Sequence, residues 1–112
     1  KNTLASREIM LRAIPSSSAL MMNYPNPFNP ETWIPYKIAQ DADVTVKVYN
    51  IAGQLIRSIE LGHKNKGYYT RKDKAAYWDG CNEFGEVVGS GVYFYTLKAG
   101  DFVYTRKMVL TK

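Results

Sequence analysis

The fold is decided by the stretch Asp43-Val-Thr-Val-Lys-Val-Tyr-Asn50. Apolar residues alternate strictly with the others along it: one set is Val44, Val46 and Val48, and the other is Thr45, Lys47 and Tyr49. Successive side chains of a β-strand point to opposite faces, so this alternation predicts a strand with one buried and one solvent-facing side.

Similar short strands are expected on both sides of this stretch, because aromatic and β-branched residues recur between turn residues. The expected strands are residues 32–38, 43–50, 54–61, 67–78, 91–99 and 102–110, and the turns are Ala52-Gly53, Gly62 to Gly67, Asp79 to Gly85 and Gly100-Asp101. Pro35 lacks an N–H donor and places the first strand at an edge or a bulge. Such a run of six or seven short strands predicts an all-β fold, an immunoglobulin-like antiparallel β-sandwich of about seven strands.

Residues 1–22 follow another pattern and form a predicted N-terminal arm or linker, with the sandwich at 23–112. Ile9, Met10, Ala13 and Ile14 are spaced to share one face of a short helix, which Pro15 would end. Two interpretations remain open. The arm is either a remnant that links to an upstream domain or an apolar segment that docks on a neighbouring subunit.

Composition fits one small soluble domain, since the 112 residues are 46% hydrophobic and 22% charged. The formal charge of +5 favours anionic partners, among them nucleic acid and acidic glycolipid. No run of about 18 apolar residues is present, so we expect no membrane span. The chain begins at Lys1, which suggests a fragment of a longer precursor.

Catalysis, cofactors and metals are not expected. His63 is the sole histidine and lies far in sequence from Cys81, the sole cysteine, so no nucleophile and base are paired. The loop from Asp79 to Glu86 carries three carboxylates, but it lacks the alternating spacing of a calcium loop.

A mixture of basic and aromatic residues forms a predicted basic-aromatic patch: Lys64, Lys66, Tyr68, Tyr69, Arg71, Lys72 and Lys74. Such a mixture is typical of a platform for single-stranded nucleic acid. The favoured interpretation is a solvated hairpin whose lysines protect an edge strand from mispairing. Nucleic-acid binding is therefore the weaker alternative.

Five short blocks carry a resemblance to a known family: Tyr24-Pro-Asn-Pro-Phe-Asn-Pro-Glu-Thr32, Val48-Tyr-Asn-Ile-Ala-Gly-Gln54, Trp78-Asp-Gly80, Ser90-Gly-Val-Tyr-Phe-Tyr95 and Arg106-Lys-Met-Val-Leu110. In order and spacing they resemble the type IX secretion C-terminal sorting domains (Por secretion type A). These domains are similar in turn to the immunoglobulin-like domain of flagellar hook-capping proteins.

The resemblance implies a non-catalytic module that ends an exported bacterial protein. Such a module crosses the periplasm and is recognised as a folded surface by outer-membrane secretion machinery. It directs attachment of the protein to surface glycolipid, during which a sortase-like protease can cut the module off. The implied location is extracellular or on the cell surface. The alternative is a structural subunit of an extracellular filament or layer, joined by self-association through the N-terminal arm.

Two groups of residues are candidates for recognition: Asn26, Phe28 and Asn29 in the proline-rich block, and Arg106, Lys107 and Lys112 near the C-terminus. The prolines restrict the backbone around the asparagines, and the segment is expected to form a rigid entry to the sandwich. We expect Phe28 to close one end of the core, Trp78 to be a core aromatic, and Asp79 to stabilise the turn after it.

Overall fold

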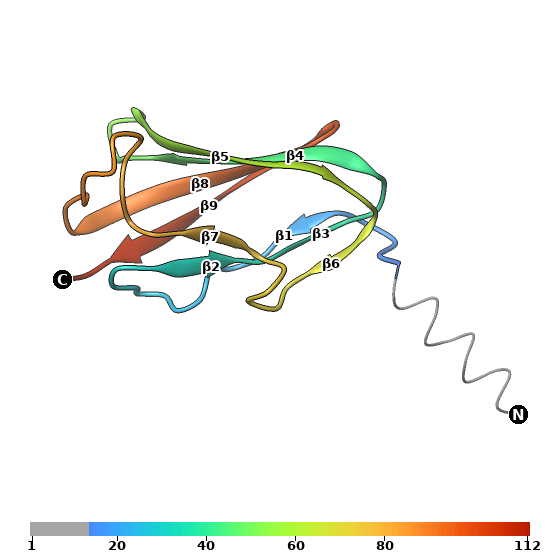
Figure 1. The fold of residues 1–112 in the computed structure, drawn as a ribbon, viewed down its shortest axis with the longest axis horizontal. Helices are drawn as coiled ribbons and strands as arrows, with labels where there is room; N and C mark the ends of the chain where they lie inside the picture. The colour runs from blue at the N-terminus through green and yellow to red at the C-terminus, as the bar shows by residue number, and fades with distance from the viewer. Residues whose placement is uncertain (1–13) are drawn as a thin grey trace, which may run out of the picture.

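The structure is a computed structural model that describes residues 14–112. Two β-layers face each other in this part (Figure 1). The nine strands of the described part are β1 (Ala19–Leu20), β2 (Thr32–Ile34), β3 (Tyr36–Ile38), β4 (Ala42–Tyr49), β5 (Leu55–Lys64), β6 (Gly67–Tyr69), β7 (Ala76–Trp78), β8 (Gly91–Ala99) and β9 (Phe102–Leu110). The prediction of an all-β, immunoglobulin-like sandwich is confirmed, with more and shorter strands than expected.

One layer is a four-stranded antiparallel sheet in the order β5-β4-β8-β9. Val46 of β4 lies opposite Leu97 of β8 and Ile59 of β5, so β4 is in the interior of the sheet. Val44, Val46 and Val48 are all buried, and the residues between them are not. The strict alternation therefore predicted the buried face of this strand correctly.

The second layer combines the sheet β1-β3-β6 with the pair β2-β7. The predicted strand 32–38 is divided at Pro35 into β2 and β3, because proline has no N–H to donate. The carbonyl of Pro35 instead accepts the N–H of Met21 at 3.0 Å. Among the described residues β2 has β7 as its only strand partner and so lies at an edge, whereas β3 lies between β1 and β6. The edge expected for this segment thus holds for β2 and is wrong for β3.

Two other predicted boundaries are also wrong. The stretch 67–78 is two strands, because the N–H groups of Lys74 and Ala75 both bond to the carbonyl of Arg71 and close a turn between β6 and β7. β5 continues through Gly62 to Lys64, where a connection was expected. Its register shifts opposite Val44 and Thr45, beside Gly62, whose φ of +78° suits such an irregularity.

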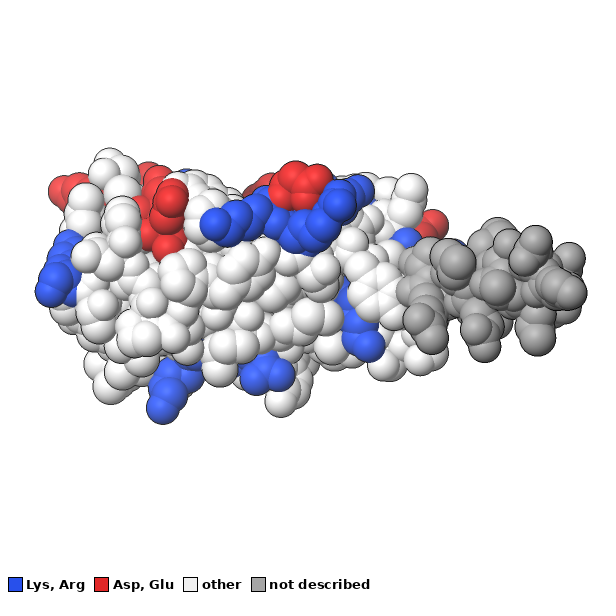
Figure 2. Space-filling view, turned by 90° about the horizontal axis from the view of Figure 1, so that it is seen from below, with Lys and Arg blue, Asp and Glu red and all other residues white. Residues whose placement is uncertain are grey.

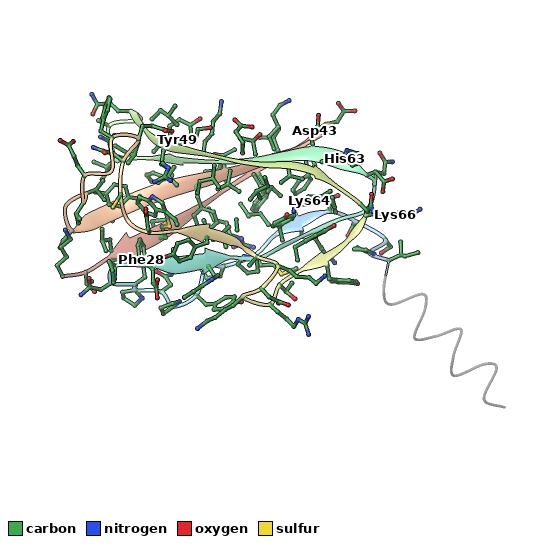
Figure 3. The ribbon with its side chains drawn as sticks, viewed as in Figure 1. Phe28, Asp43, Tyr49, His63, Lys64 and Lys66 are labelled. Atoms are coloured by element: carbon green, nitrogen blue, oxygen red, sulfur yellow. The ribbon has the colours of Figure 1, made fainter. Side chains whose placement is uncertain are left out.

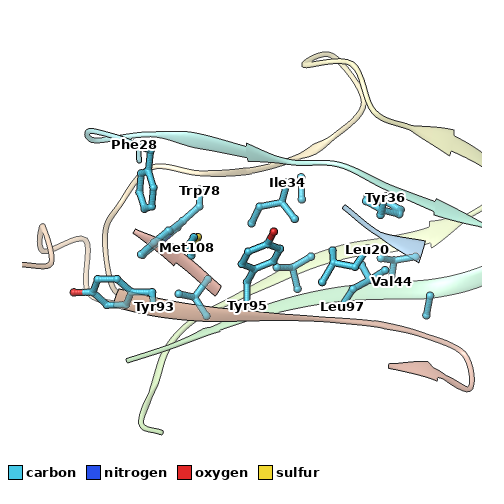
Figure 4. Close-up of a cluster of buried hydrophobic side chains, with 14 of the residues drawn as sticks. Leu20, Phe28, Ile34, Tyr36, Val44, Trp78, Tyr93, Tyr95, Leu97 and Met108 are labelled. Atoms are coloured by element: carbon cyan, nitrogen blue, oxygen red, sulfur yellow. The ribbon is translucent and has the colours of Figure 1, made fainter. Parts of the chain in front are cut away.

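The core lies between the layers and is rich in aromatic rings (Figure 4). Phe28 and Trp78 are each 1% exposed, and their ring centroids are 5.6 Å apart. Tyr93 continues this row, 5.7 Å from Trp78. Phe28 lies at one end of the sandwich (Figure 3), and the expected roles of Phe28 and Trp78 are both confirmed. Burial of aromatic surface here is a main source of stability.

Two of the sequence blocks meet beside this core. Asp79 Oδ1 accepts the N–H of Cys81 at 3.0 Å and stabilises the turn as predicted. Gly80 has a φ of +80°, and a Cβ at this position would lie 2.5 Å from the carbonyl oxygen of Pro30. Only glycine allows this approach, so the turn after β7 and the proline-rich segment fit together closely.

The folded part begins earlier than residue 23. Ala19 and Leu20 form β1, which pairs with β3, and Leu20 is 1% exposed. Ile14 is 49% exposed, and the other predicted arm residues, Ile9, Met10 and Ala13, lie outside the described residues. Within residues 14–112, no helix has the length and apolar character needed to cross a membrane.

Candidate functional site

The C-terminal strand β9 is an edge of the four-stranded sheet. Near its end the proline-rich segment covers this edge: the N–H of Val109 donates to Asn26 Oδ1 at 3.1 Å, and the N–H of Phe28 donates to the carbonyl of Val109 at 3.0 Å. The N–H of Thr111 donates to the carbonyl of Phe28 at 3.0 Å. Residues 26–28 thus close the last part of the edge.

The remainder of this edge is open. Backbone groups of alternate residues point to the same side of an antiparallel strand, so those of Val103, Thr105 and Lys107 share the outward direction of Val109. No strand of the described part pairs with them. All three residues are exposed. We call this stretch the open β9 edge.

A shallow groove of about 230 Å³ runs between β9 and β1. It is lined by Ser18, Ala19, Leu20, Phe102, Tyr104 and Arg106. Arg106 Nε donates to the carbonyl of Leu20 at 2.6 Å, and its guanidinium lies 5.5 Å from the ring centroid of Tyr104. The ring of Tyr104 is stacked beside that of Phe102 at 6.4 Å, so the groove joins two aromatic rings and one cation.

Tyr95 fixes the other side of the N-terminal segment. Its hydroxyl donates to the carbonyl of Met21 at 2.8 Å and accepts the N–H of Asn23 at 2.9 Å. Burial raises the pKa of Tyr95 to about 12, although the hydrogen bond from Asn23 and the charge of Arg106 act in the opposite direction. The neutral hydroxyl therefore ties residues 21–23 to β8 across ordinary pH.

The structure brings together three of the six predicted recognition residues. Asn26 and Phe28 contact the end of β9, and Arg106 lines the groove farther along the same strand. Asn29, Lys107 and Lys112 are exposed, and no side-chain hydrogen bond joins them to another described residue.

The predicted basic-aromatic patch does not form one surface. Tyr69 stacks on Tyr36 at 4.9 Å with Lys64 nearby, whereas Tyr68, the preceding residue, lies under Lys37. Consecutive residues of a strand point to opposite faces, which explains the separation.

The cations of this patch are divided as well. Lys64 and Lys66 lie at the end of the sandwich opposite to Phe28 (Figure 3). Arg71 pairs with Asp73 at 3.1 Å, and Lys72 Nζ lies 4.2 Å above the ring of Trp33. Lys74 is exposed on the same turn.

Polar side chains elsewhere serve local structure. His63 Nδ1 is 3.3 Å from Asp43 Oδ1 on the exposed surface of β4 and β5 (Figure 3). In the loop after β7, Glu83 accepts the N–H of Ser58, and Asp79 pairs with Arg57 at 3.3 Å. Among residues 14–112, no group of three His, Cys, Asp or Glu side chains is arranged to hold a metal ion.

The link between Tyr95 and Asn23 was not predicted from the sequence. They are 72 residues apart, and only the strand register brings them together. The available signal was the alternation of Tyr93, Tyr95 and Leu97, which marks the buried face of β8.

This two-layer arrangement of antiparallel strands defines an immunoglobulin-like module. A family model, FlgD Ig-like domain, matches residues 31–101, and the chain belongs to this family.

Two solved structures from Porphyromonas gingivalis contain a similar fold. One is dimeric latent PorU, with a TM-score of 0.63 and 17% identity over 87% of this chain. The other is PorZ, described as an essential bacterial surface component of the type-IX secretion system, with a TM-score of 0.55 and 18% identity over 84% of this chain. The chain spans only 10% and 12% of the two proteins, and no curated protein matches its sequence.

Proposed function

We propose that this chain is a non-catalytic sorting and surface-attachment module of a secreted bacterial protein. Its partners would be outer-membrane secretion machinery and surface glycolipid, reached by export through the periplasm. The observation that carries the proposal is the open β9 edge at Val103, Thr105 and Lys107, beside the groove that contains Arg106. Its membership of the FlgD Ig-like family and its likeness to parts of PorU and PorZ are consistent with this role.

The chemistry of the edge suits recognition of a folded domain. An exposed edge strand offers a row of N–H and C=O groups to an added strand from a partner, and the neighbouring side chains give specificity. The groove supplies the rings of Phe102 and Tyr104 and the charge of Arg106. Asn26 and Phe28 cover the end of β9, so an added strand could pair only with the open β9 edge.

The test is export of a reporter passenger fused to residues 1–112 in a host with a type IX secretion system. Deleting residues 106–112 would remove Met108 and Leu110, which are 0% and 1% exposed, so it would unfold the domain. Thr105→Pro is a better variant. It removes one outward N–H at an edge position, where proline is tolerated. We expect a folded protein whose passenger stays inside the cell.

Glu60→Pro is the matched control on the opposite edge of the same sheet. Ser58 donates its N–H outward to Glu83, so the N–H of Glu60, two residues on, also points away from β4. Both variants should keep similar thermal midpoints, and only Thr105→Pro should lose export. Undiminished export of folded Thr105→Pro would refute the role of this edge.

A structural subunit of a filament or layer is the second candidate, because an open edge also accepts a strand from another copy. Light scattering after gel filtration distinguishes the two. The assembly function requires residues 1–112 to self-associate more strongly than residues 14–112. Monomers in both cases would exclude joining through the N-terminal arm.

A further inference from the structure

Three aromatic side chains form a row across the outer face of the second layer. Trp33 of β2 lies opposite Tyr77 of β7 on one side and opposite Tyr24 on the other. Its ring centroid is 5.4 Å from that of Tyr77 and 6.5 Å from that of Tyr24. The outward face of a two-layer sandwich is ordinarily polar, so three neighbouring aromatic rings there indicate a binding surface. We call them the aromatic row.

The rings at both ends of the row are held in place. The Tyr24 hydroxyl donates to the carbonyl of Thr70 at 2.6 Å, and the Tyr77 hydroxyl donates to Glu31 Oε1 at 2.7 Å. The hydrogen bond to Glu31 is the main cause that raises the pKa of Tyr77 to about 12. Because the rings are already oriented, a ligand that stacks on them loses little conformational freedom of the protein.

Lysine side chains lie beside the row. Figure 2 shows this face as a broad uncharged strip with Lys, Arg, Asp and Glu side chains at its margins. Lys72 Nζ lies 4.2 Å over the Trp33 ring, and Lys37 lies over Tyr68 on the same face. Arg71 is already paired with Asp73, whereas Lys37 and Lys72 have no carboxylate partner among the described residues.

We infer that the aromatic row and its lysines bind an acidic polysaccharide. The C–H face of a pyranose ring packs on an aromatic ring, and the row offers successive rings to successive sugars. A carboxylate on the sugar would form an ion pair with Lys72. Because Lys72 is on an exposed turn, its ammonium group can move from the Trp33 ring to the carboxylate. The Glu31 carboxylate accepts sugar hydroxyls at the other end.

Single-stranded nucleic acid fits this surface less well. It requires stacking rings along a continuous positive track. Here Glu31 lies at one end of the row, Asp73 neutralises Arg71, and Tyr69 is turned away to stack on Tyr36. Sugar hydroxyls can donate to the Glu31 carboxylate, whereas a phosphate backbone has no hydrogen to donate there, so the surface suits an acidic sugar better.

Calorimetric titration of the whole chain tests the inference with three probes. They are a short oligogalacturonate, the same oligomer with its carboxylates methyl-esterified, and a single-stranded thymidine oligonucleotide. We expect the oligogalacturonate to bind most tightly. The ester should bind more weakly by roughly tenfold or less, because stacking remains after the charge is removed.

Two variants separate the contributions of the ring and the charge. Trp33→Ala should weaken oligogalacturonate binding by roughly tenfold, or about 1.4 kcal/mol, and Trp33→Tyr should restore most of it. Lys72→Met keeps the apolar stem on an exposed turn, so it should fold normally. This variant should bind the oligogalacturonate roughly threefold more weakly and should bind the methyl ester with unchanged affinity.

Phe84→Ala is the matched control, because this ring is 87% exposed on the loop after β7 and lies outside the row. It should bind the oligogalacturonate like the unaltered chain. The inference is overturned if the chain does not bind oligogalacturonate, if folded Trp33→Ala binds it equally well, or if the thymidine oligonucleotide binds more tightly. This experiment does not depend on export, so its outcome is independent of the sorting function.

Discussion

Two buried tyrosines should respond in opposite ways to the same substitution. Tyr36 and Tyr95 are each 0% exposed, and replacing either with phenylalanine removes only the hydroxyl. The Tyr95 hydroxyl has two hydrogen-bond partners, Met21 and Asn23. The Tyr36 hydroxyl has no partner among the described residues. We expect Tyr95→Phe to destabilise the protein and Tyr36→Phe to be neutral or stabilising.

The magnitudes follow from what each change leaves behind. Tyr95→Phe strands the N–H of Asn23, a residue 2% exposed, which costs about 2 kcal/mol. Tyr36→Phe removes a hydroxyl that is buried without a bond, which gains about 1 kcal/mol. For a domain of this length, each kcal/mol shifts the thermal midpoint by roughly 4 °C. The two variants should therefore differ by about 12 °C.

Urea and thermal unfolding followed by circular dichroism measure the difference. The wild-type chain is the reference, and a similar urea dependence in all three proteins would indicate that the unfolded states are comparable. Equal midpoints for the two variants would refute the reasoning, as would a Tyr36→Phe protein less stable than wild type by more than about 1 kcal/mol.

The same pair predicts a loss of stability in alkali. Burial raises the pKa of both hydroxyls above the unfolded value of about 10. Because the folded state keeps these protons to a higher pH than the unfolded state, ionisation of the two hydroxyls does not affect stability below pH 10, and the free energy of unfolding falls as the pH rises above it. Each tyrosine accounts for a loss of about 1.4 kcal/mol per pH unit up to its folded pKa. Tyr36→Phe should flatten the decline in urea stability between about pH 10 and 12 by that amount, and an unchanged slope would contradict it.

Two further stability predictions use matched controls. Gly80→Ala should lower the free energy of unfolding in urea by about 2 kcal/mol more than Gly85→Ala. Both glycines have a φ of +80°, but only at Gly80 would the added Cβ meet a backbone oxygen, that of Pro30. Equal losses for the two variants would show that this contact relaxes. Arg106→Ala should cost about 1 kcal/mol through the lost bond to the β1 carbonyl, whereas exposed Lys107→Ala should change stability by less than about 0.5 kcal/mol. A larger effect at Lys107 would argue against an open edge.

The sequence predicted what local periodicity determines. Alternation identified the buried valines of β4, and Gly100-Asp101 marked the hairpin between β8 and β9. It did not reveal where a strand is interrupted. The division at Pro35 depends on a bond from Met21, and the one between β6 and β7 depends on a turn closed by Arg71.

The surfaces were harder to predict than the strands, because they depend on register between distant segments. Tyr68 and Tyr69 are neighbours in sequence but face opposite ways. Tyr24 and Trp33 form one row with Tyr77, which comes from a distant part of the sequence. Closeness in sequence therefore suggested a shared surface for Tyr68 and Tyr69, which do not have one, and gave no sign of the row that includes Tyr77.

The two edges of the four-stranded sheet differ, and this difference limits how copies of the chain can join. On β5, Glu83 occupies the N–H of Ser58, and two register shifts bend the strand. The β9 side is open from Val103 to Lys107. If two copies pair through that side, each uses the same surface, and the product is a two-fold dimer in which both β9 edges are occupied. Pairing through β9 alone would therefore stop at two copies, and a longer polymer would require a second and different contact.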